Sequence, residues 1–125
     1  MLWPLISNLR AVKTPEEIEL IKYVCKTTTE SEIMAARSAK PGLLQNQIQS
    51  VFQFQHSTKT GCTQLGFNSI ASSGCDCATL HYIENDKIIE PNQMVLLDMG
   101  GKWYGYVADQ AITFPVSGKF TQHQR

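Results

Sequence analysis

The sequence of 125 residues lacks an excess of charge of either sign and lacks any long apolar run. Eleven lysines and arginines balance eleven aspartates and glutamates, so the sequence predicts no electrostatic attraction to nucleic acid or to an acidic membrane surface. No stretch reaches the roughly 18 consecutive apolar residues of a membrane-spanning helix. The apolar start is broken by Pro4 and by the polar pair Ser7-Asn8, so we do not interpret it as a secretory signal peptide.

Cysteine is scarce, and its spacing matches neither a zinc site nor a disulfide framework. The Cys75-Asp76-Cys77 segment has C-x-C spacing, but no C-x-x-C or H-x-H accompanies it, so the indication of zinc is weak. Cys25 falls in a helical pattern, where a thiol commonly serves as a small buried hydrophobe, and Cys62 is the fourth cysteine. We therefore expect reduced thiols in an intracellular protein.

The first half of the sequence predicts two helices. Thr14-Pro15-Glu16-Glu17 combines a capping threonine, a proline at the first helical position and a capping-box glutamate. The helix that follows should end at Lys40-Pro41-Gly42. Glu32 falls on its apolar stripe, which is anomalous for a buried face. That stripe is made by Ile18, Ile21, Cys25, Thr28 and Ala35.

The second helix should run from about residue 43 to 58 and end at Lys59-Thr60-Gly61. Its stripe is formed by Leu44, Ile48, Val51 and Phe52 or Gln55.

Strand patterns follow the helices. Residues 67–71 alternate, residues 79–82 form a short strand-like run, and residues 94–98 and 106–116 read as a hairpin. Two helices followed by antiparallel strands predict an α+β domain, near the usual size of a single domain.

Two aspartates end the strand-like runs of this hairpin. If the turn is centred between Trp103 and Tyr104, Asp98 lies directly opposite Asp109, with Cβ atoms about 4.5–5.5 Å apart. Two ionised carboxylates this close repel each other, and a bound cation would remove the repulsion. Gly100 and Gly101 would let the backbone bend and leave room beside Asp98. The alternative is that both aspartates are solvated residues at strand ends, and Trp-Tyr is not a favoured two-residue turn.

Several motifs resemble the catalytic domain of the aminopeptidase P and prolidase family, the pita-bread metallopeptidases. They are LHY, ND, LLDMGG, GYVAD and TFPVSGKFT, and upstream NLRAVKTPEEIELIKY and SAKPG fit as well. The resemblance covers about residues 8–125 and is strongest to Xaa-Pro aminopeptidases. It implies a lead-in over residues 1–13 and the first half of a pita-bread catalytic domain over residues 14–125.

The resemblance implies a role for three residues. Asp98 and Asp109 match the two family aspartates that bind a pair of metal ions, with Asp109 as the bridging ligand. His81 matches a histidine that lines the prolyl pocket and contacts the substrate. The metal would be manganese, with cobalt or zinc as alternatives, since hard carboxylate ligands suit manganese. The implied reaction is attack of a metal-activated hydroxide on the amide carbon before proline.

The sequence departs from the family pattern in three respects. The later histidine and two glutamates of the family site have no match here, and His56 and His123 lie in the wrong contexts to replace them. Ala111 and Ile112 stand where the family usually has threonine and arginine, a loss that would weaken metal binding about 10–100-fold. Glu32 stands where an aromatic or apolar residue is usual.

These departures leave two hypotheses for function. The first is a fragment of a metalloaminopeptidase that is inactive alone, and the second is a non-catalytic scaffold or binding module with the same fold. The expected partner is a peptide with proline at its second position, with no nucleic acid or membrane, and a homo-oligomer is possible. The compartment would be cytoplasmic or mitochondrial.

Overall fold

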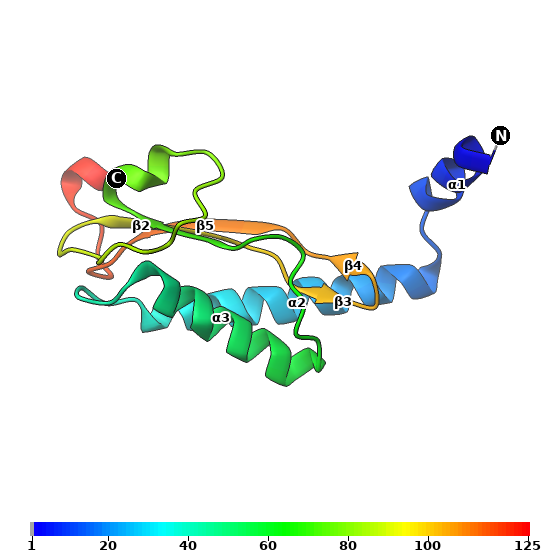
Figure 1. Cartoon of the computed structure of the whole chain (residues 1–125), viewed down its shortest axis with the longest axis horizontal. Helices are drawn as coiled ribbons and strands as arrows, with labels where there is room; N and C mark the ends of the chain where they lie inside the picture. Colours follow the sequence, from blue (N-terminus) through cyan, green and yellow to red (C-terminus); the bar gives the residue numbers. More distant parts are fainter. Residues whose placement is uncertain (1) are drawn as a thin grey trace.

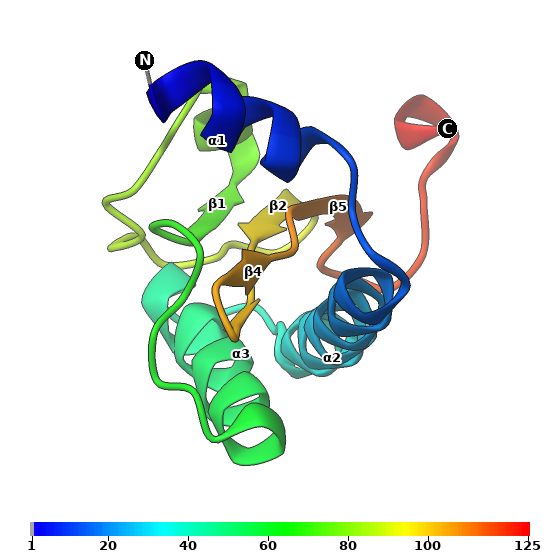
Figure 2. The ribbon, with the colours of Figure 1, turned by 90° about the vertical axis from the view of Figure 1, so that its right-hand side faces the viewer.

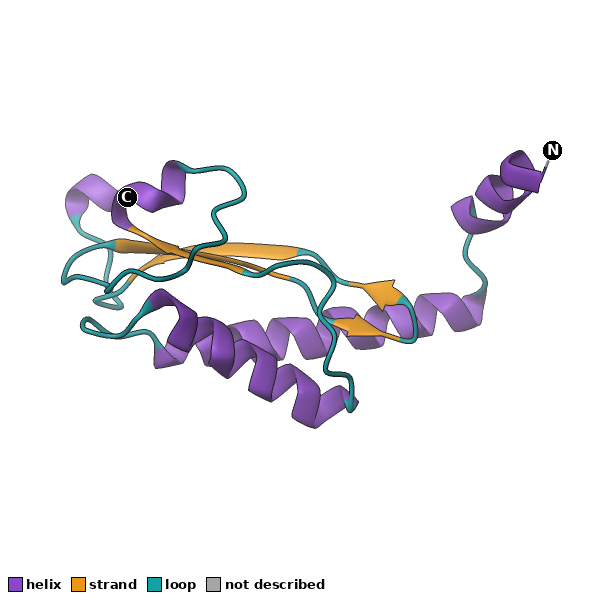
Figure 3. Ribbon diagram, viewed as in Figure 1, coloured by secondary structure: helices purple, strands orange, loops and turns teal. Residues whose placement is uncertain are grey.

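Two long helices cover one face of a small antiparallel sheet in the computed structural model, which describes residues 2–125 (Figure 1). Helix α2 spans Pro15–Ser38 and helix α3 spans Gln45–Thr60. A third helix, α1, spans Leu2–Ala11 and projects away from both layers (Figure 3). Among the described residues, no helix has the length and apolar character needed to cross a membrane.

The start of α2 forms as its sequence predicts. The Thr14 hydroxyl accepts a hydrogen bond from the Glu17 backbone N–H at 3.2 Å, and the Thr14 N–H donates to the Glu17 carboxylate at 2.7 Å. This reciprocal pair satisfies two donors that have no partner within the helix. The second predicted helix is also confirmed, and Gly61, with φ of 69°, ends it in the left-handed conformation that glycine adopts readily.

Helix α1 was not predicted, because residues 1–13 show no capping signal and were interpreted as a lead-in. None of its residues is buried. Leucine and tryptophan side chains are largely exposed along it, with Leu9 77% and Trp3 71% accessible. The helix therefore presents an apolar surface that the rest of the described chain does not cover.

The main sheet has three strands in the order β1-β2-β5, all antiparallel. Strand β1 spans Ile70–Ser73, β2 spans Met94–Met99 and β5 spans Gln110–Pro115. A smaller two-stranded sheet pairs β3, Lys102–Trp103, with β4, Tyr106–Val107. Short 3₁₀ helices span Gly74–Ala78 and Gln122–Gln124. The α+β class with antiparallel strands is thus confirmed.

Three strand predictions need correction. The run at residues 79–82 is not a strand, because it forms a turn after the 3₁₀ helix and His81 has φ of 54°. The first strand begins at Ile70 and extends to Ser73, later than residues 67–71. The predicted long strand at residues 106–116 is interrupted at Ala108-Asp109, so that it forms the separate strands β4 and β5.

The core lies between the helices and the sheet. Strand β2 alternates, so that Val95, Leu97 and Met99 point toward the helices and are fully buried. Ile48 and Phe52 of α3 are fully buried as predicted, whereas Ile18 of α2 is 42% exposed and does not belong to the core. Figure 2 shows the two helices side by side below the strands.

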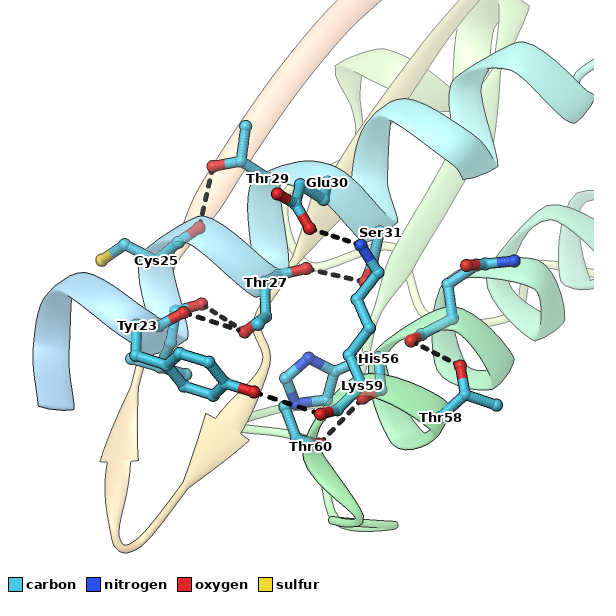
Figure 4. A network of polar contacts seen from close by, with 12 residues as sticks. Tyr23, Cys25, Thr27, Thr29, Glu30, Ser31, His56, Thr58, Lys59 and Thr60 are labelled. Carbon is cyan, nitrogen blue, oxygen red and sulfur yellow. Dashed lines mark hydrogen bonds and ion pairs between the residues drawn. The ribbon is translucent and has the colours of Figure 1, made fainter.

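Polar contacts join α2 to α3 (Figure 4), and a further one joins α3 to strand β3. The Tyr23 hydroxyl donates to the Lys59 carbonyl oxygen at 3.1 Å, and Lys59 forms an ion pair with Glu30. The fully buried His56 ring places Nε2 3.1 Å from the backbone of Lys102 in β3. His56 is therefore a structural residue that fixes β3 on α3.

Candidate metal and peptide site

The hairpin that carries the two aspartates has a different register from the one predicted. Trp103 pairs with Tyr106, so the turn is Tyr104-Gly105 and lies one residue later than assumed. Both turn residues have positive φ, 46° and 85°, as a tight two-residue hairpin turn of this twist requires. As a consequence Asp98 pairs with Ala111 and not with Asp109.

Asp98 and Asp109 nevertheless lie on the same side of the sheet. A shift of two residues in a partner changes a directly opposed pair into a diagonal pair and leaves both side chains on one face. Both aspartates line a cavity of about 420 Å³ on the face opposite the helices. The predicted proximity is thus retained, while the predicted direct pairing is wrong. The other lining residues are Phe67, Asn68, Ile70, His81 and Ile83.

Gly100 permits close packing beside the aspartates. A Cβ atom at this position would lie 2.2 Å from the Phe67 ring and 2.5 Å from the Ala108 carbonyl oxygen. The glycine therefore brings the backbone of Ala108 and the ring of Phe67 against β2, next to Asp98. The sequence predicted open space beside Asp98 at this glycine, but the Phe67 ring and the Ala108 backbone fill that space.

His81 reaches the cavity from a loop that a buried hydrogen-bond network holds over the sheet. The neighbouring Tyr82 is buried, and its hydroxyl donates to Gln45 Oε1 at 2.8 Å. Gln45 in turn donates from Nε2 to the Ser73 hydroxyl at 3.0 Å. Helix α3 and strand β1 therefore fix the position of the loop that carries His81.

Asn85 supplies the second anchor of this loop. Its Oδ1 accepts from the Ala71 N–H at 2.8 Å, and its Nδ2 donates to the Ser69 carbonyl oxygen at 2.8 Å and to Gln49 Oε1 at 3.1 Å. Its φ of 48° is one that asparagine tolerates better than most residues. Nothing in the sequence signals these buried partners.

The charges of the site disfavour two ionised aspartates. Burial, and after it the negative charge of Asp109, raise the pKa of Asp98, and the nearby His81 partly offsets this rise. Asp98 Oδ1 is buried and has no hydrogen-bond partner within the described chain. A buried carboxylate oxygen without a donor is available to bind a cation.

Glu32 lies in the buried helix layer near this site. Only 2% of its surface is exposed, and its Oε1 has no hydrogen-bond partner among the described residues. Burial, and after it the charge of Asp98, raise the pKa of Glu32 to about 7. The anomaly in the sequence is therefore real, and the helix accommodates this residue without a break.

The remaining histidines and cysteines do not extend the aspartate pair. Within residues 2–125, no group of three or more His, Cys, Asp and Glu side chains is arranged to hold a metal ion. His56 is buried against β3, His123 lies in the C-terminal 3₁₀ helix, and all four cysteines are free thiols.

Comparison with known proteins identifies the family. The family model described as "Metallopeptidase family M24" matches residues 19–125. The chain is 37% identical over 96% of its length to an uncharacterised peptidase of Saccharomyces cerevisiae, of which it covers 22%. It is 34% identical to the Xaa-Pro aminopeptidase of Haemophilus influenzae and 32% identical to the human Xaa-Pro dipeptidase, with 98% and 100% of the chain covered. It covers 28% and 26% of these two relatives, so it spans about a quarter of their length.

Solved structures agree with the sequence relatives. An alanine variant of Escherichia coli aminopeptidase P superposes with a TM-score of 0.94 at 32% identity, over 98% of this chain and 28% of that one. The zinc-substituted form of the same enzyme in complex with product superposes with a TM-score of 0.90 at 32% identity, over 94% of this chain and 26% of that one. The pita-bread architecture and the matched family model agree, and the chain belongs to metallopeptidase family M24.

Proposed function

We propose that Asp98 and Asp109 bind a divalent metal and that this site serves hydrolysis of the peptide bond before a proline, as in an Xaa-Pro aminopeptidase. The observation that carries the proposal is the aspartate pair in one cavity with His81. Relatives named Xaa-Pro aminopeptidase and Xaa-Pro dipeptidase support the choice of substrate.

The two carboxylates suit a hard divalent cation. Their charges repel each other when no cation is bound, and Asp98 Oδ1 has no competing hydrogen-bond donor among residues 2–125. Oxygen ligands favour manganese and similar ions, and zinc or cobalt would also be accepted. A bound metal would supply an activated water and polarise the scissile carbonyl.

The residues of the chain bind and orient the peptide in this proposal. The free amine of the substrate would lie near Asp98 and the metal. His81, fixed by the loop network, contacts the peptide near the bond to proline. Phe67, Ile70 and Ile83 give the same cavity apolar walls that suit a pyrrolidine ring.

Two ligands do not make a strong catalytic site. Catalytic zinc sites, for example, use three protein ligands and keep one position open. We therefore propose that these 125 residues alone hold the metal weakly and hydrolyse the peptide slowly, and that full activity requires additional ligands.

Peptide hydrolysis at saturating Mn²⁺ tests the proposal. Ala-Pro-Ala and Ala-Ala-Ala are incubated with the chain, and release of free alanine is followed, with EDTA and Asp109→Asn as controls. Metal-dependent cleavage that prefers the proline peptide and is lost in Asp109→Asn supports the proposal. Equal cleavage of both peptides, or cleavage that EDTA does not reduce, contradicts it.

A second candidate function is a non-catalytic binding module. It is favoured by the ligand count within residues 2–125, because no third metal-ligating side chain joins the aspartates. Mn²⁺ and peptide binding without any cleavage would support this candidate over the enzyme.

A further inference from the structure

Three buried polar side chains lie in the helix layer without hydrogen-bond partners. Thr28 of α2 and His56 of α3 are fully buried, and Glu32 of α2 is 2% exposed. Within residues 2–125, Thr28 Oγ1, His56 Nδ1 and Glu32 Oε1 are each unpaired. Buried polar atoms in folded proteins nearly always have a partner, so three unpaired atoms in one layer indicate that they serve one another.

The Thr28 hydroxyl differs from its neighbours on α2. Thr27, Thr29 and Ser31 donate to carbonyl oxygens of their own helix, at 3.1, 2.8 and 2.7 Å (Figure 4). Thr28 lies in the same run, and its hydroxyl forms no such bond within the described chain. This hydroxyl is therefore available for a partner on another element.

Gly101 brings the Thr28 hydroxyl and the His56 ring together. A Cβ atom at Gly101 would lie 2.4 Å from Thr28 Oγ1 and 2.7 Å from His56 Nδ1. The two atoms are therefore at most about 5 Å apart, close enough for a hydrogen bond after a small side-chain rotation or through one water. A side chain at position 101 would occupy the space where they meet.

The contacts of Nε2 determine which nitrogen of His56 carries the proton. Nε2 lies 3.1 Å from both the backbone nitrogen and the carbonyl oxygen of Lys102. A protonated Nε2 would leave the Lys102 N–H without an acceptor, whereas an unprotonated Nε2 accepts from it. Because an unpaired N–H is rarer in folded proteins than an under-used carbonyl oxygen, the proton belongs on Nδ1.

Glu32 completes the set of partners. It follows Thr28 by four residues on α2, so the two side chains are neighbours on one face of the helix. A hydroxyl group accepts one hydrogen bond and donates another, so Thr28 can accept from His56 and donate to Glu32. One donor, one group that does both and one acceptor thus satisfy all three unpaired atoms.

The backbone that His56 holds also connects the two aspartates. Asp98 lies in β2, three residues before Gly101. The Gly101 carbonyl oxygen accepts from the Ala108 N–H at 3.0 Å, and Ala108 directly precedes Asp109. A displacement of the His56 ring would therefore move Asp109 relative to Asp98.

We propose that His56 Nδ1–H donates to Thr28 and Thr28 donates to Glu32, and that this α2–α3 network holds the two aspartates at the spacing a metal needs. His56 and Thr28 are positioning residues, since they act on the site through the backbone of Gly101 and Lys102. The effect on the metal rests on the proposed function, because it assumes that the aspartates bind one.

Nitrogen-15 NMR of the metal-free chain reports which imidazole nitrogen of His56 carries the proton. In the natural chain the proton should lie on Nδ1. Thr28→Val keeps the shape of the side chain and removes the hydroxyl, so the Nδ1 proton should exchange with water about tenfold faster, as expected for the loss of one hydrogen bond. A proton on Nε2 of the natural chain overturns the inference, and that result requires no variant.

Hydrogen exchange of the backbone amides tests the effect on the site. In Thr28→Val the Ala108 amide should exchange about tenfold faster, while the amides of β2 keep their rates. Thr28→Ser retains a hydroxyl and should restore the natural rate at Ala108. An unchanged rate in Thr28→Val, or an equal increase throughout β2, overturns the inference.

Thr27→Val is the matched control. Thr27 is 4% exposed on the same helix, but its hydroxyl donates to the Tyr23 and Val24 carbonyl oxygens of α2. The variant removes a buried hydroxyl of the same kind and should leave the Ala108 rate unchanged. Equal acceleration in Thr27→Val and Thr28→Val would show that any buried hydroxyl of α2 has this effect, which contradicts the network.

Titration of Mn²⁺ separates this inference from the proposed function. Mn²⁺ should bind Thr28→Val about tenfold more weakly than the natural chain, the lower end of the range for residues that orient metal ligands. Equal affinity of the two proteins overturns the inference and leaves the proposed function intact. Absence of Mn²⁺ binding to the natural chain contradicts the proposed function, and the exchange rate at Ala108 then decides the inference.

Discussion

The buried carboxyl group of Glu32 makes the stability of the folded chain depend on pH. Its pKa rises from an ordinary value of 4.5 to about 7 in the folded chain because of burial and the charge of Asp98. A carboxyl group with a raised folded pKa keeps its proton more strongly when folded. Its contribution to folding is complete below about pH 4.5 and is lost as the pH rises through 7.

Glu32→Gln should remove this dependence. Between pH 4 and pH 8 the variant should gain about 3 kcal/mol in unfolding free energy relative to the natural chain, as expected for a shift of this size. Urea denaturation at both pH values measures the difference. Glu19→Gln is the matched control, because Glu19 is exposed on the same helix. A difference between Glu32→Gln and the natural chain that does not change with pH would contradict the assignment.

The candidate site residues were accessible to sequence reasoning because they sit in short motifs. His81, Asp98 and Asp109 occupy one cavity, although their roles stay predictions. The exact pairing of the aspartates was not accessible, because the turn depends on Tyr104 adopting a positive φ. A tyrosine in that conformation is uncommon, and Tyr104-Gly105 is not one of the residue pairs that favour a two-residue hairpin turn.

At the scale of elements, the loop that carries His81 depends on buried side-chain hydrogen bonds. Asn85→Ala would remove three of them and leave the buried N–H of Ala71 without a partner. We expect a loss of about 2–4 kcal/mol in unfolding free energy, since each unsatisfied buried group costs 1–3 kcal/mol.

Asn92→Ala is the control for Asn85→Ala. Asn92 also has a positive φ, 68°, but it is exposed, and within the described chain only its backbone oxygen, not its side chain, forms a hydrogen bond. Asn92→Ala therefore measures only the free-energy cost of placing alanine at a positive φ. Chemical denaturation of both variants measures the difference, and equal losses would show that the buried network does not stabilise the loop.

The elements themselves were predictable in unequal measure. Helix α2 begins at the capping residue Thr14, and glycine or proline lies at or just beyond the end of each of the two long helices. These signals act locally, and both helices were predicted. Residues 79–82 have strand-like composition, yet the network from Tyr82 to Gln45 folds them into a turn. Long-range contacts therefore determine the conformation of residues 79–82. Helix α1 was not predictable because no capping residue marks its start.

At the scale of the whole molecule, large apolar side chains remain uncovered. Leu5 and Leu9 of α1 are 62% and 77% exposed, and β5 is an edge strand of the main sheet. Exposed apolar surface and unpaired strand edges both favour association. We expect the chain to self-associate at micromolar concentration.

The double variant Leu5→Gln and Leu9→Gln should reduce this association without loss of stability, because α1 contains no buried residue. Light scattering with a thermal melt measures both properties. A monodisperse monomer of the natural chain with a sharp melt would contradict the expectation.

Titration of Mn²⁺ into the chain, followed by paramagnetic broadening of backbone amide signals, tests the central claim most directly. The account predicts saturable binding with a Kd on the order of 0.1–1 mM, which corresponds to a binding free energy of about −5 kcal/mol. The binding is weak because the described part of the chain offers two protein ligands at this site. The signals near Asp98 and Asp109 should broaden first, and Asp98→Asn should abolish the effect. Broadening that is uniform over the surface, or that persists in Asp98→Asn, would contradict the assignment of the metal site.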